Sequence, residues 1–394
     1  MEKGKSLDNS IEEAMQLWPD YSTSFSNVVL STLLPSAEDG KNIVVSPVRL
    51  QAVLVMLANW ASPTIRKRIL ACVGSDIMSL KEANLLSSKN LLEVTPSDYY
   101  ENEGEKIVPT IEQRAILWAK NGLEVDEEMV AKLAEDFSIM LKQVDFNAET
   151  KSIIDKTINE ATHGLIKSLE VEYAQDTLAL ITDILYFKGT WEETFEEDKT
   201  REQLFFGSNG KHKVPMMKRT GFMEYAEWGS CQIAVLPYQC YSDDRQFSMR
   251  IFLPKPKYTI QNVLSEIRDN CYSLDTNESE VRLTLPRFSV ESNGKMKDLL
   301  NRLGLSCIFT SKDIAPKLIK GLLINNIYQQ AKVDVDEKGT EAAVVTYMDM
   351  VGGLPPMEMQ KPVVMKVNRP FMFEITEETT NTILFAGVIN NIEP

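Results

Sequence analysis

The sequence predicts an α+β fold in a single domain that spans residues 1–394. Segments with helical spacing concentrate in the first half, whereas alternating and continuously apolar segments concentrate in the second half. No linker and no internal repeat separates the two halves. A chain of 394 residues exceeds the usual domain of roughly 100–200 residues, which favours two lobes, but the mixing of the elements favours one domain.

The first half combines helices with short strands. Residues 150–169 form the clearest amphipathic helix, because Ile154, Ile158 and Leu165 recur at helical spacing. The other elements predicted here are helices over 10–34, from Pro47 onward and over 127–134, a weakly periodic helix after residue 75, and strands over 43–45 and 113–120.

Strands dominate from residue 177 onward. Residues 177–187 are almost continuously apolar, which is typical of a central strand buried on both faces, and the one charge in it, Asp183, needs a partner. The other predicted elements are strands over 223–225, 232–236, 247–253 and 281–285, a hairpin of 371–375 and 382–389, and helices over 260–271 and 295–303.

The segment 333–350 is unusual because it combines strand and loop features. Apolar and acidic residues alternate over 333–336, which predicts a half-buried strand, and Gly339 then interrupts the pattern. Alternation resumes up to Met350 and leads into a Gly-Gly-Leu-Pro-Pro run over 352–356, typical of an exposed loop. The simpler alternative is an edge strand followed by a surface loop.

Composition argues against several classes of partner. The net charge of −15 is unfavourable for binding nucleic acid or a membrane surface, which attract excess Lys and Arg.

The five cysteines predict a mostly reduced protein, although Cys231 and Cys240 are close enough in sequence to pair. The N-terminus lacks the apolar run of a signal peptide. We therefore expect a soluble, cytoplasmic protein, or a secreted one if an export signal was removed or is unconventional.

Motifs for catalysis are mostly absent. The sequence has no Gly-rich phosphate loop and no metal-binding pair of Cys or His, so no cofactor and no metal site are expected. Of the two histidines, His163 is expected at a helix end and His212 in a turn. A Cys–His site requires only that the partners meet in space, so a cysteine hydrolase using His163 stays a minor alternative.

Seven short motifs resemble those of the serpin family and follow the family's order. They include Asn-Ile-Val-Val-Ser-Pro at 42–47, Tyr-Phe-Lys-Gly-Thr-Trp at 186–191 and Asp-Glu-Lys-Gly-Thr-Glu-Ala-Ala at 336–343. The other four lie at 162–166, 214–217, 285–288 and 368–371. The resemblance implies a monomer with three β-sheets, about eight or nine helices and an exposed reactive-centre loop at about 337–362.

The resemblance also implies a function. An inhibitory serpin is a suicide substrate of serine or cysteine endopeptidases: the protease cleaves the loop, forms an acyl-enzyme and is trapped when the loop inserts as a strand of sheet A. Such a trap is kinetic rather than an equilibrium state. The alternative is a non-inhibitory serpin that acts as a binding or chaperone-like protein.

Residue roles follow from the resemblance one by one. The breach holds Trp191 and Arg287, and Arg287 corresponds to the partner of Glu337. The shutter positions are Ser46, Arg49, Asp183 and Gln329. The hinge comprises Glu337, Lys338, Gly339, Thr340, Glu341, Ala342, Ala343, Val344 and Val345.

Several of these residues depart from the family pattern. Val344 and Val345 replace smaller residues, and stiff β-branched side chains affect insertion. Arg49 stands where a shutter serine is usual, Asp183 where asparagine is expected, and Gln329 where histidine is frequent. We expect Arg49 and Asp183 to form a compensating pair.

The bond that the protease would cleave is placed by counting. The family's usual interval from Glu337 gives Gly353–Leu354, whereas counting back from Pro370 by the shortest family loops gives a bond near Met359. We favour the first, because an inserted strand must be free of proline. Neighbouring candidates are Met350, Val351 and Pro355. A small or apolar residue at the bond favours elastase-like, subtilisin-like or papain-like proteases over trypsin-like ones.

Overall fold

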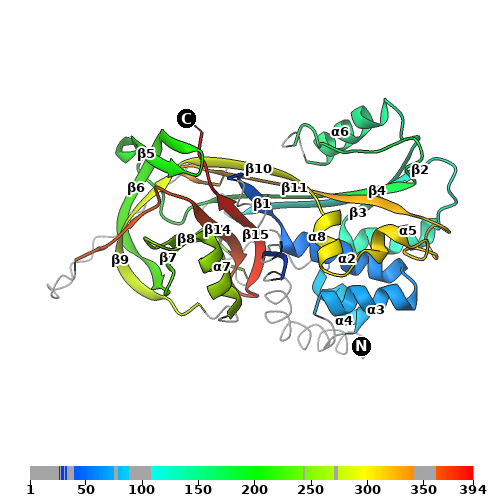
Figure 1. Cartoon of the computed structure of the whole chain (residues 1–394), viewed down its shortest axis with the longest axis horizontal. Coiled ribbons are helices and arrows are strands. Elements are labelled where there is room, and N and C mark those ends of the chain that lie inside the picture. Colours follow the sequence, from blue (N-terminus) through cyan, green and yellow to red (C-terminus); the bar gives the residue numbers. More distant parts are fainter. Residues whose placement is uncertain are drawn as a thin grey trace.

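The computed structural model describes residues 40–74, 79–87, 108–162, 166–242, 245–269, 274–340 and 361–393, together with positions 26, 28–30, 32, 94 and 164. Within these residues the strands form two sheets, one of six strands and one of nine. The molecule is elongated: the six-stranded sheet follows its long axis, and much of the nine-stranded sheet lies at one end (Figure 1).

The six-stranded sheet contains the central strand that the sequence predicts. Its order is β10 (Phe288–Lys295), β11 (Ile324–Val335), β12 (Gly339–Thr340), β4 (Ala179–Thr190), β2 (Thr110–Lys120) and β3 (Ile139–Val144). β4 is buried along nearly its whole length, as expected for a strand covered on both faces. β11 and β4 pair in parallel, and β12 enters between them only at one end.

Helices cover both faces of this sheet. The helix α6 (Thr150–Ala161) packs Ile158 against Leu180 on one face. On the other face Ile181 belongs to the main core, which it shares with α2 (Pro47–Trp60). Figure 1 shows the two helices on opposite sides of the sheet. Because successive strand residues point to opposite faces, adjacent positions of β4 serve two different cores.

The nine-stranded sheet corrects the expectation of three sheets. Its order is β1 (Ile43–Val45), β15 (Thr382–Ile389), β14 (Phe371–Glu377), β8 (Phe247–Pro254), β7 (Cys231–Pro237), β6 (Gly210–Glu227), β9 (Asn277–Pro286) and β13 (Val363–Lys366), with β5 (Arg201–Gly207) paired to β6. β6 is 18 residues long; it pairs first with β5, then with β9 and finally with β7. Two of the expected sheets therefore share one strand and form one continuous sheet.

The other described helices are α3 (Pro63–Cys72), α4 (Leu80–Ser87), α5 (Glu127–Phe137), α7 (Ile260–Asp269), α8 (Lys297–Arg302), α9 (Cys307–Thr310) and the 3₁₀ helix η4 (Glu197–Lys199). None of the helices in the described ranges is long and apolar enough to cross a membrane.

Two local predictions are wrong. α6 ends at Ala161 rather than at residue 169. The hydroxyl of Thr162 donates to the carbonyl of Ile158 (2.8 Å) and accepts the N–H of Ile166 (3.1 Å), so the chain leaves the helix there. His212 lies within β6 rather than in a turn, since it pairs with Phe205 of β5. His163 lies outside the described residues.

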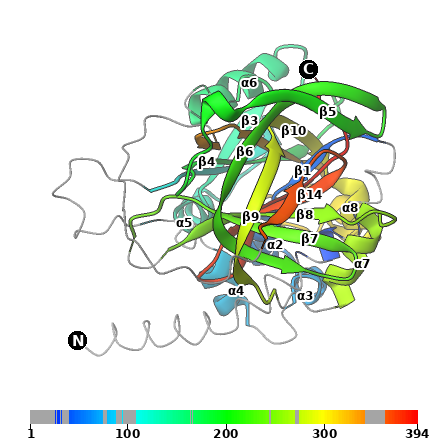
Figure 2. The same ribbon diagram turned by 90° about the vertical axis from the view of Figure 1, so that its left-hand side faces the viewer.

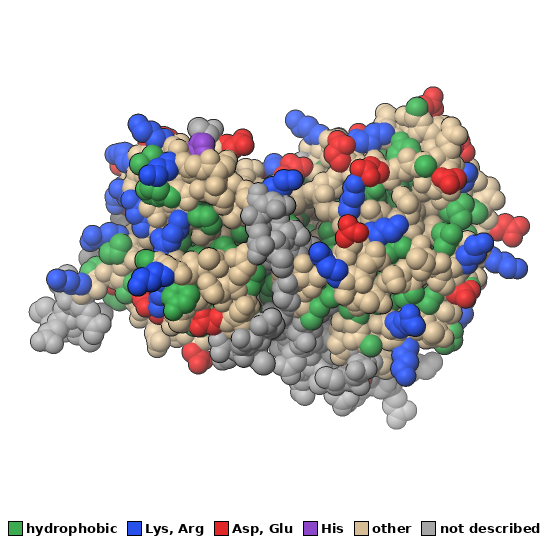
Figure 3. Space-filling model, in the orientation of Figure 1, with side chains coloured by type: hydrophobic (Ala, Val, Ile, Leu, Met, Phe, Trp, Pro, Cys, Tyr) green, Lys and Arg blue, Asp and Glu red, His purple; other side chains and the backbone are tan. Residues whose placement is uncertain are grey.

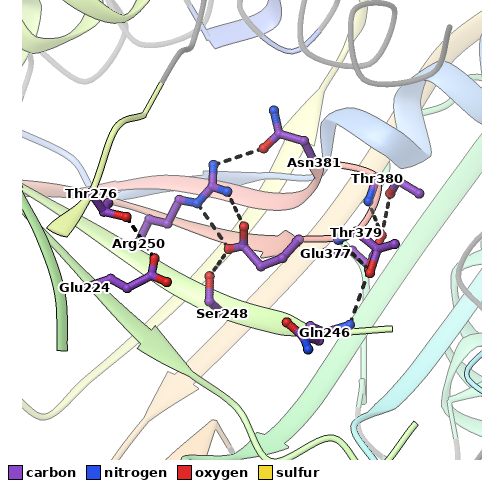
Figure 4. A network of polar contacts seen from close by, with 10 residues as sticks. Glu224, Gln246, Ser248, Arg250, Thr276, Glu377, Thr379, Thr380 and Asn381 are labelled. Carbon is purple, nitrogen blue, oxygen red and sulfur yellow. Dashed lines mark hydrogen bonds and ion pairs between the residues drawn. The ribbon is translucent and has the colours of Figure 1, made fainter. Parts of the chain in front are cut away.

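The predicted hairpin near the C-terminus is confirmed as β14 and β15, and charged residues hold its turn (Figure 4). Arg250 on β8 forms an ion pair with Glu378 and donates to Oδ1 of Asn381 (3.1 Å). The carboxylate of Glu377 accepts the backbone N–H of Thr380 (2.9 Å). These contacts bind the turn to the neighbouring strand and satisfy carboxylates that burial alone would destabilise.

Candidate functional site

The segment that combines strand and loop features begins as β11 and then reverses direction. β12 returns beside β11, so that Thr340 pairs with Val335 on one side and with Gly189 of β4 on the other. Among the described residues, Gly339 and Thr340 alone occupy this position between the two strands. Elsewhere β11 and β4 pair directly, as at Tyr328–Ala331. We call the space between β11 and β4 at this end the hinge slot.

Gly339 fits the hinge slot because it has no side chain. Its φ is +154°, which L side chains rarely adopt, and a Cβ would lie 2.1 Å from the carbonyl oxygen of Gly189. Asp336 closes the preceding turn: its Oδ1 accepts the N–H groups of Lys338 (2.8 Å) and Gly339 (3.1 Å). A larger residue than glycine would displace the chain from the slot.

An ion pair holds the start of the hinge. Nη2 of Arg287 donates to both carboxylate oxygens of Glu337 (2.8 and 2.7 Å), and the hydroxyl of Thr200 donates to Oε1 (2.7 Å). Burial raises the pKa of the Glu337 carboxyl, but the hydrogen bonds from Arg287 and Thr200 outweigh burial and hold the pKa below its usual value. The carboxylate is therefore charged at neutral pH. The sequence-based pairing of Arg287 with Glu337 is present in the structure.

Two aromatic residues line the slot. The backbone N–H of Trp191 donates to the carbonyl of Lys338 (2.8 Å), and its indole N–H donates to that of Asp336 (3.0 Å). The ring of Tyr238 stacks on Trp191 with centroids 4.5 Å apart. The hydroxyl of Tyr238 lies 2.8 Å from Oγ1 of Thr340, and burial raises the pKa of that phenol, so it stays neutral. The hinge slot therefore provides Thr340 with a buried hydrogen-bond partner, the hydroxyl of Tyr238.

A second polar group lies in the interior of the sheet, and we call it the shutter network. It consists of Ser46 and Arg49 of the α2 start, Gln113 of β2, Asp183 of β4 and Gln329 of β11. Nε and Nη2 of Arg49 donate to Oδ1 of Asp183 (3.0 and 2.8 Å), and its Nη1 donates to Gln113 (2.7 Å). The expected Arg49–Asp183 pair is confirmed, and both side chains are nearly inaccessible to solvent (2% and 1%).

Gln329 completes the shutter network from β11. Its Nε2 donates to the carbonyl of Ser46 (2.9 Å) and to Oδ2 of Asp183 (3.3 Å), and its Oε1 accepts the N–H of Ser46 (2.7 Å). The side-chain hydroxyl of Ser46 is buried and has no hydrogen-bond partner in the described structure. Ser46 therefore contributes its backbone rather than its hydroxyl.

Sequence reasoning missed three members of these contacts: Tyr238, Thr200 and Gln113. None carries a local signal, because each meets its partner from a distant strand or loop. The hinge positions Glu341, Ala342, Ala343, Val344 and Val345 lie outside the described residues, as do Gly353, Leu354 and the neighbouring candidates Met350, Val351 and Pro355.

Neither Cys72 nor Cys231 is an activated nucleophile. Cys231 and Cys240 do not form a disulfide with each other. Burial raises the pKa of Cys72 to about 11 and that of Cys231 to about 12, so both thiols stay protonated at neutral pH. Within the described ranges no cluster of His, Cys, Asp or Glu has the arrangement of a metal site.

Comparison with known proteins agrees with this architecture. The family model described as Serpin (serine protease inhibitor) matches residues 21–392. An uncharacterized serpin-like protein of Thermococcus kodakarensis is 31% identical over 290 residues, which cover 70% of this chain and 65% of that protein. Serpin-Z2 of Arabidopsis thaliana is 28% identical over 393 residues, with coverage of 96% and 89%.

Solved structures show the same fold. Serpin48 of the insect Tenebrio molitor superposes with a TM-score of 0.81 at 23% identity, covering 96% of this chain and 99% of that one. AtSerpin1 of Arabidopsis in its native stressed conformation gives 0.78 at 23% identity, with coverage of 97% and 98%. The family model describes protease inhibitors rather than enzymes. From the family match, the relatives and the fold together, this chain belongs to the serpin family.

Proposed function

We propose that this chain is a suicide-substrate inhibitor of endopeptidases, which traps the acyl-enzyme by inserting the cleaved loop between β4 and β11. The observation that carries the proposal is β12, whose residues Gly339 and Thr340 already pair with both strands. Continuing this strand would replace one parallel ladder by two antiparallel ladders. Antiparallel pairing is slightly more stable per residue, so insertion is favoured.

Strand lengths support the same proposal. The fourteen positions from Thr340 to Gly353 would extend roughly 45 Å at ~3.3 Å per residue. β4 and β11 contain 12 residues each, or roughly 40 Å at that rise. A loop cleaved after Gly353 therefore matches the length of the two strands that would receive it.

We further propose the bond Gly353–Leu354 as the cleavage site. Its small and apolar residues suit elastase-like, subtilisin-like or papain-like proteases, because trypsin-like enzymes require Arg or Lys. Pro355 and Pro356 follow the bond and so lie outside the segment that must join the sheet.

The test incubates the protein with pancreatic elastase, subtilisin, papain and trypsin and analyses the products on denaturing gels. Inhibition predicts a covalent complex with at least one of the first three proteases, and a higher Tm of the protein after loop cleavage. Sequencing of the released C-terminal fragment would locate the bond. Cleavage without a complex and without a rise in Tm would refute the proposal and favour a non-inhibitory serpin, for which the stiff side chains of Val344 and Val345 are the supporting observation.

A variant tests the insertion step separately. Thr340 is 1% exposed within the slot, so Thr340→Arg would place an unpaired charge in the sheet. We expect this variant to be cleaved without forming the complex. The matched control Thr310→Arg makes the same substitution at an exposed position of α9, outside the hinge slot, so it should form the complex normally.

A further inference from the structure

The most exposed large apolar side chains of the described structure lie at one end of the molecule. Phe222 on β6 is 64% exposed and Val364 on β13 is 60% exposed, more than any of the other large apolar residues that reach the surface. β6 and β9 form the end that faces the viewer in Figure 2, and β13 pairs with β9. Exposed apolar area that is rimmed by polar residues is one mark of an interaction surface.

Basic side chains accompany these apolar groups. Lys218 and Lys366 both pair with Thr284 of β9, one from each side, so they share one face of the sheet. Arg282 lies two residues before Thr284 and therefore on the same face, next to Val364. We call Lys218, Phe222, Arg282, Val364 and Lys366 the pole patch.

The basic side chains of the pole patch form no ion pairs in the described structure. Lys218, Arg282 and Lys366 are exposed, and no described carboxylate lies within ion-pair distance of them. Acidic residues border the patch on the side of Phe222: Glu280 lies opposite Phe222, and Glu224 and Glu278 form the next pair on the same face. Lys and Arg gather at this end of the molecule (Figure 3), although the whole chain has a net charge of −15.

The pole patch lies within reach of a protease at the proposed bond. Lys361 lies eight positions after Gly353 (361 − 353 = 8), and the described chain resumes there, two residues before β13. A chain of that length extends at most about 28 Å. A protease of about 230 residues has a radius of gyration of roughly 17 Å. Its body must therefore approach the end of the molecule that bears the patch.

We propose that the pole patch is a docking surface for the target protease, and that the facing protease surface is acidic around an apolar contact. This inference rests on the proposed function. The three cations would steer an acidic surface toward the loop and raise the association rate in a salt-dependent manner. Phe222 and Val364 would add apolar contact area that salt does not screen.

Nucleic acid is a poorer occupant of the pole patch. Three cations release few counterions, whereas binding of a duplex at physiological salt depends on many phosphate contacts. The exposed apolar side chains of Phe222 and Val364 offer no hydrogen bond or charge to a phosphate, and Glu280 at the border of the patch would repel one. A protein surface with both charge and apolar area fits these residues better.

The test uses one protease in two charge states, subtilisin and subtilisin whose lysines have been succinylated. Both are calibrated on a small chromogenic peptide, so that differences in the active site cancel. The measured quantity is the second-order rate at which intact protein disappears on denaturing gels. This rate counts trapped and merely cleaved molecules together, so it reports docking even if the proposed inhibition fails.

Two charge-reversal variants are compared with the wild type. The first carries Lys218→Glu, Arg282→Glu and Lys366→Glu. The matched control carries Lys312→Glu, Lys317→Glu and Lys320→Glu, which change the net charge equally. These control lysines are exposed and lie near α5, because Leu318 accepts the N–H of Asp126 just before that helix. α5 lies at the opposite end of the molecule (Figure 1).

We expect the patch variant to react with succinylated subtilisin about tenfold more slowly than wild type at low salt, and the difference to vanish at high salt. The control variant should change the rate far less. Phe222→Ser should slow the reaction to a similar extent at low and high salt. Equal rates for the patch and control variants would overturn the proposal. Retention of wild type, but not the patch variant, by a DNA duplex at physiological salt would overturn it in favour of a polyanion site.

Discussion

Removing one partner of the Arg49–Asp183 pair should destabilise the native state strongly. Arg49→Met leaves the carboxylate of Asp183 buried at 1% exposure, with the 3.3 Å hydrogen bond from Gln329 as its remaining described contact. A buried charge that loses its partner typically destabilises a protein by about 3–5 kcal/mol. We therefore expect the free energy of unfolding of Arg49→Met to fall by about that amount.

The double variant distinguishes the contribution of the ion pair from the effect of replacing each residue alone. Arg49→Met with Asp183→Leu replaces both charges by apolar groups in an interior that already contains Ile184 and Leu185. Replacing a whole buried pair is often neutral, so the double variant should lose about 1 kcal/mol or less. The coupling energy between positions 49 and 183 would then account for most of the loss of unfolding free energy in Arg49→Met.

The assay is urea unfolding of the uncleaved protein at 25 °C, followed by tryptophan fluorescence, with Gln51→Leu as a control. Gln51 is a buried polar residue of the same helix whose side chain has no hydrogen-bond partner in the described structure, so its replacement should not destabilise the protein. A loss below about 1 kcal/mol for Arg49→Met, or additive losses in the double variant, would refute the reasoning from a desolvated charge.

Three further predictions concern single contacts. Gly339→Ala puts a Cβ 2.1 Å from the carbonyl oxygen of Gly189, so the hinge should leave its slot, and hydrogen exchange over 336–340 should quicken while α2 stays protected. Tyr238→Phe removes the hydroxyl 2.8 Å from Oγ1 of Thr340 in a buried site, and the midpoint of urea unfolding should fall by an amount equivalent to about 1–2 kcal/mol; no change would show that this bond is not made in solution. Burial raises the pKa of Glu374 to about 8, against the attraction of Arg250, so the folded carboxyl keeps a proton that the unfolded one releases near pH 4.3. The free energy of unfolding should then fall by up to about 1.4 kcal/mol per pH unit as the pH rises from about 5 to 8, and Glu374→Gln should abolish this dependence. Equal pH dependences of the unfolding free energy for wild type and Glu374→Gln, measured by urea unfolding, would contradict the prediction.

The elements that sequence reasoning predicts well are those with a physical signature in a short window. The strand β1 and the helix α2 follow from an apolar triplet and a helix-starting Pro47. A partner for Asp183 was predictable because a charge in a continuously apolar strand needs a counter-charge, and the family resemblance, which places Arg49 and Asp183 at shutter positions, indicated Arg49 as that partner. Sequence resemblance located Arg287 and Glu337 as partners.

The parts that escaped prediction depend on contacts between distant segments. Tyr238 and Thr340 are 102 residues apart in the sequence, so no local sequence pattern predicts their contact. The merging of two expected sheets follows from the continuous pairing of β6, which alternation alone does not reveal. The end of α6 was misplaced because Ile166 and Leu169 are buried and keep helical spacing although they lie outside the helix.

The shutter network divides in a way that favours opening between β4 and β11. The charged contacts join Arg49 of α2 to Asp183 of β4 and to Gln113 of β2, two neighbouring strands on the same side of the gap. β11 contributes the neutral amide of Gln329, and its described bond across the gap to Asp183 is the longest of the network at 3.3 Å. The two other bonds of Gln329 reach the backbone of Ser46, at the start of the helix that bears Arg49. Insertion of a strand between β4 and β11 would replace their ladder and break the hydrogen bond from Gln329 to the carboxylate of Asp183, worth about 1–3 kcal/mol, while the buried ion pair stays intact. The sheet can therefore open between β4 and β11, because the ion pair of Arg49 and Asp183 does not join these two strands.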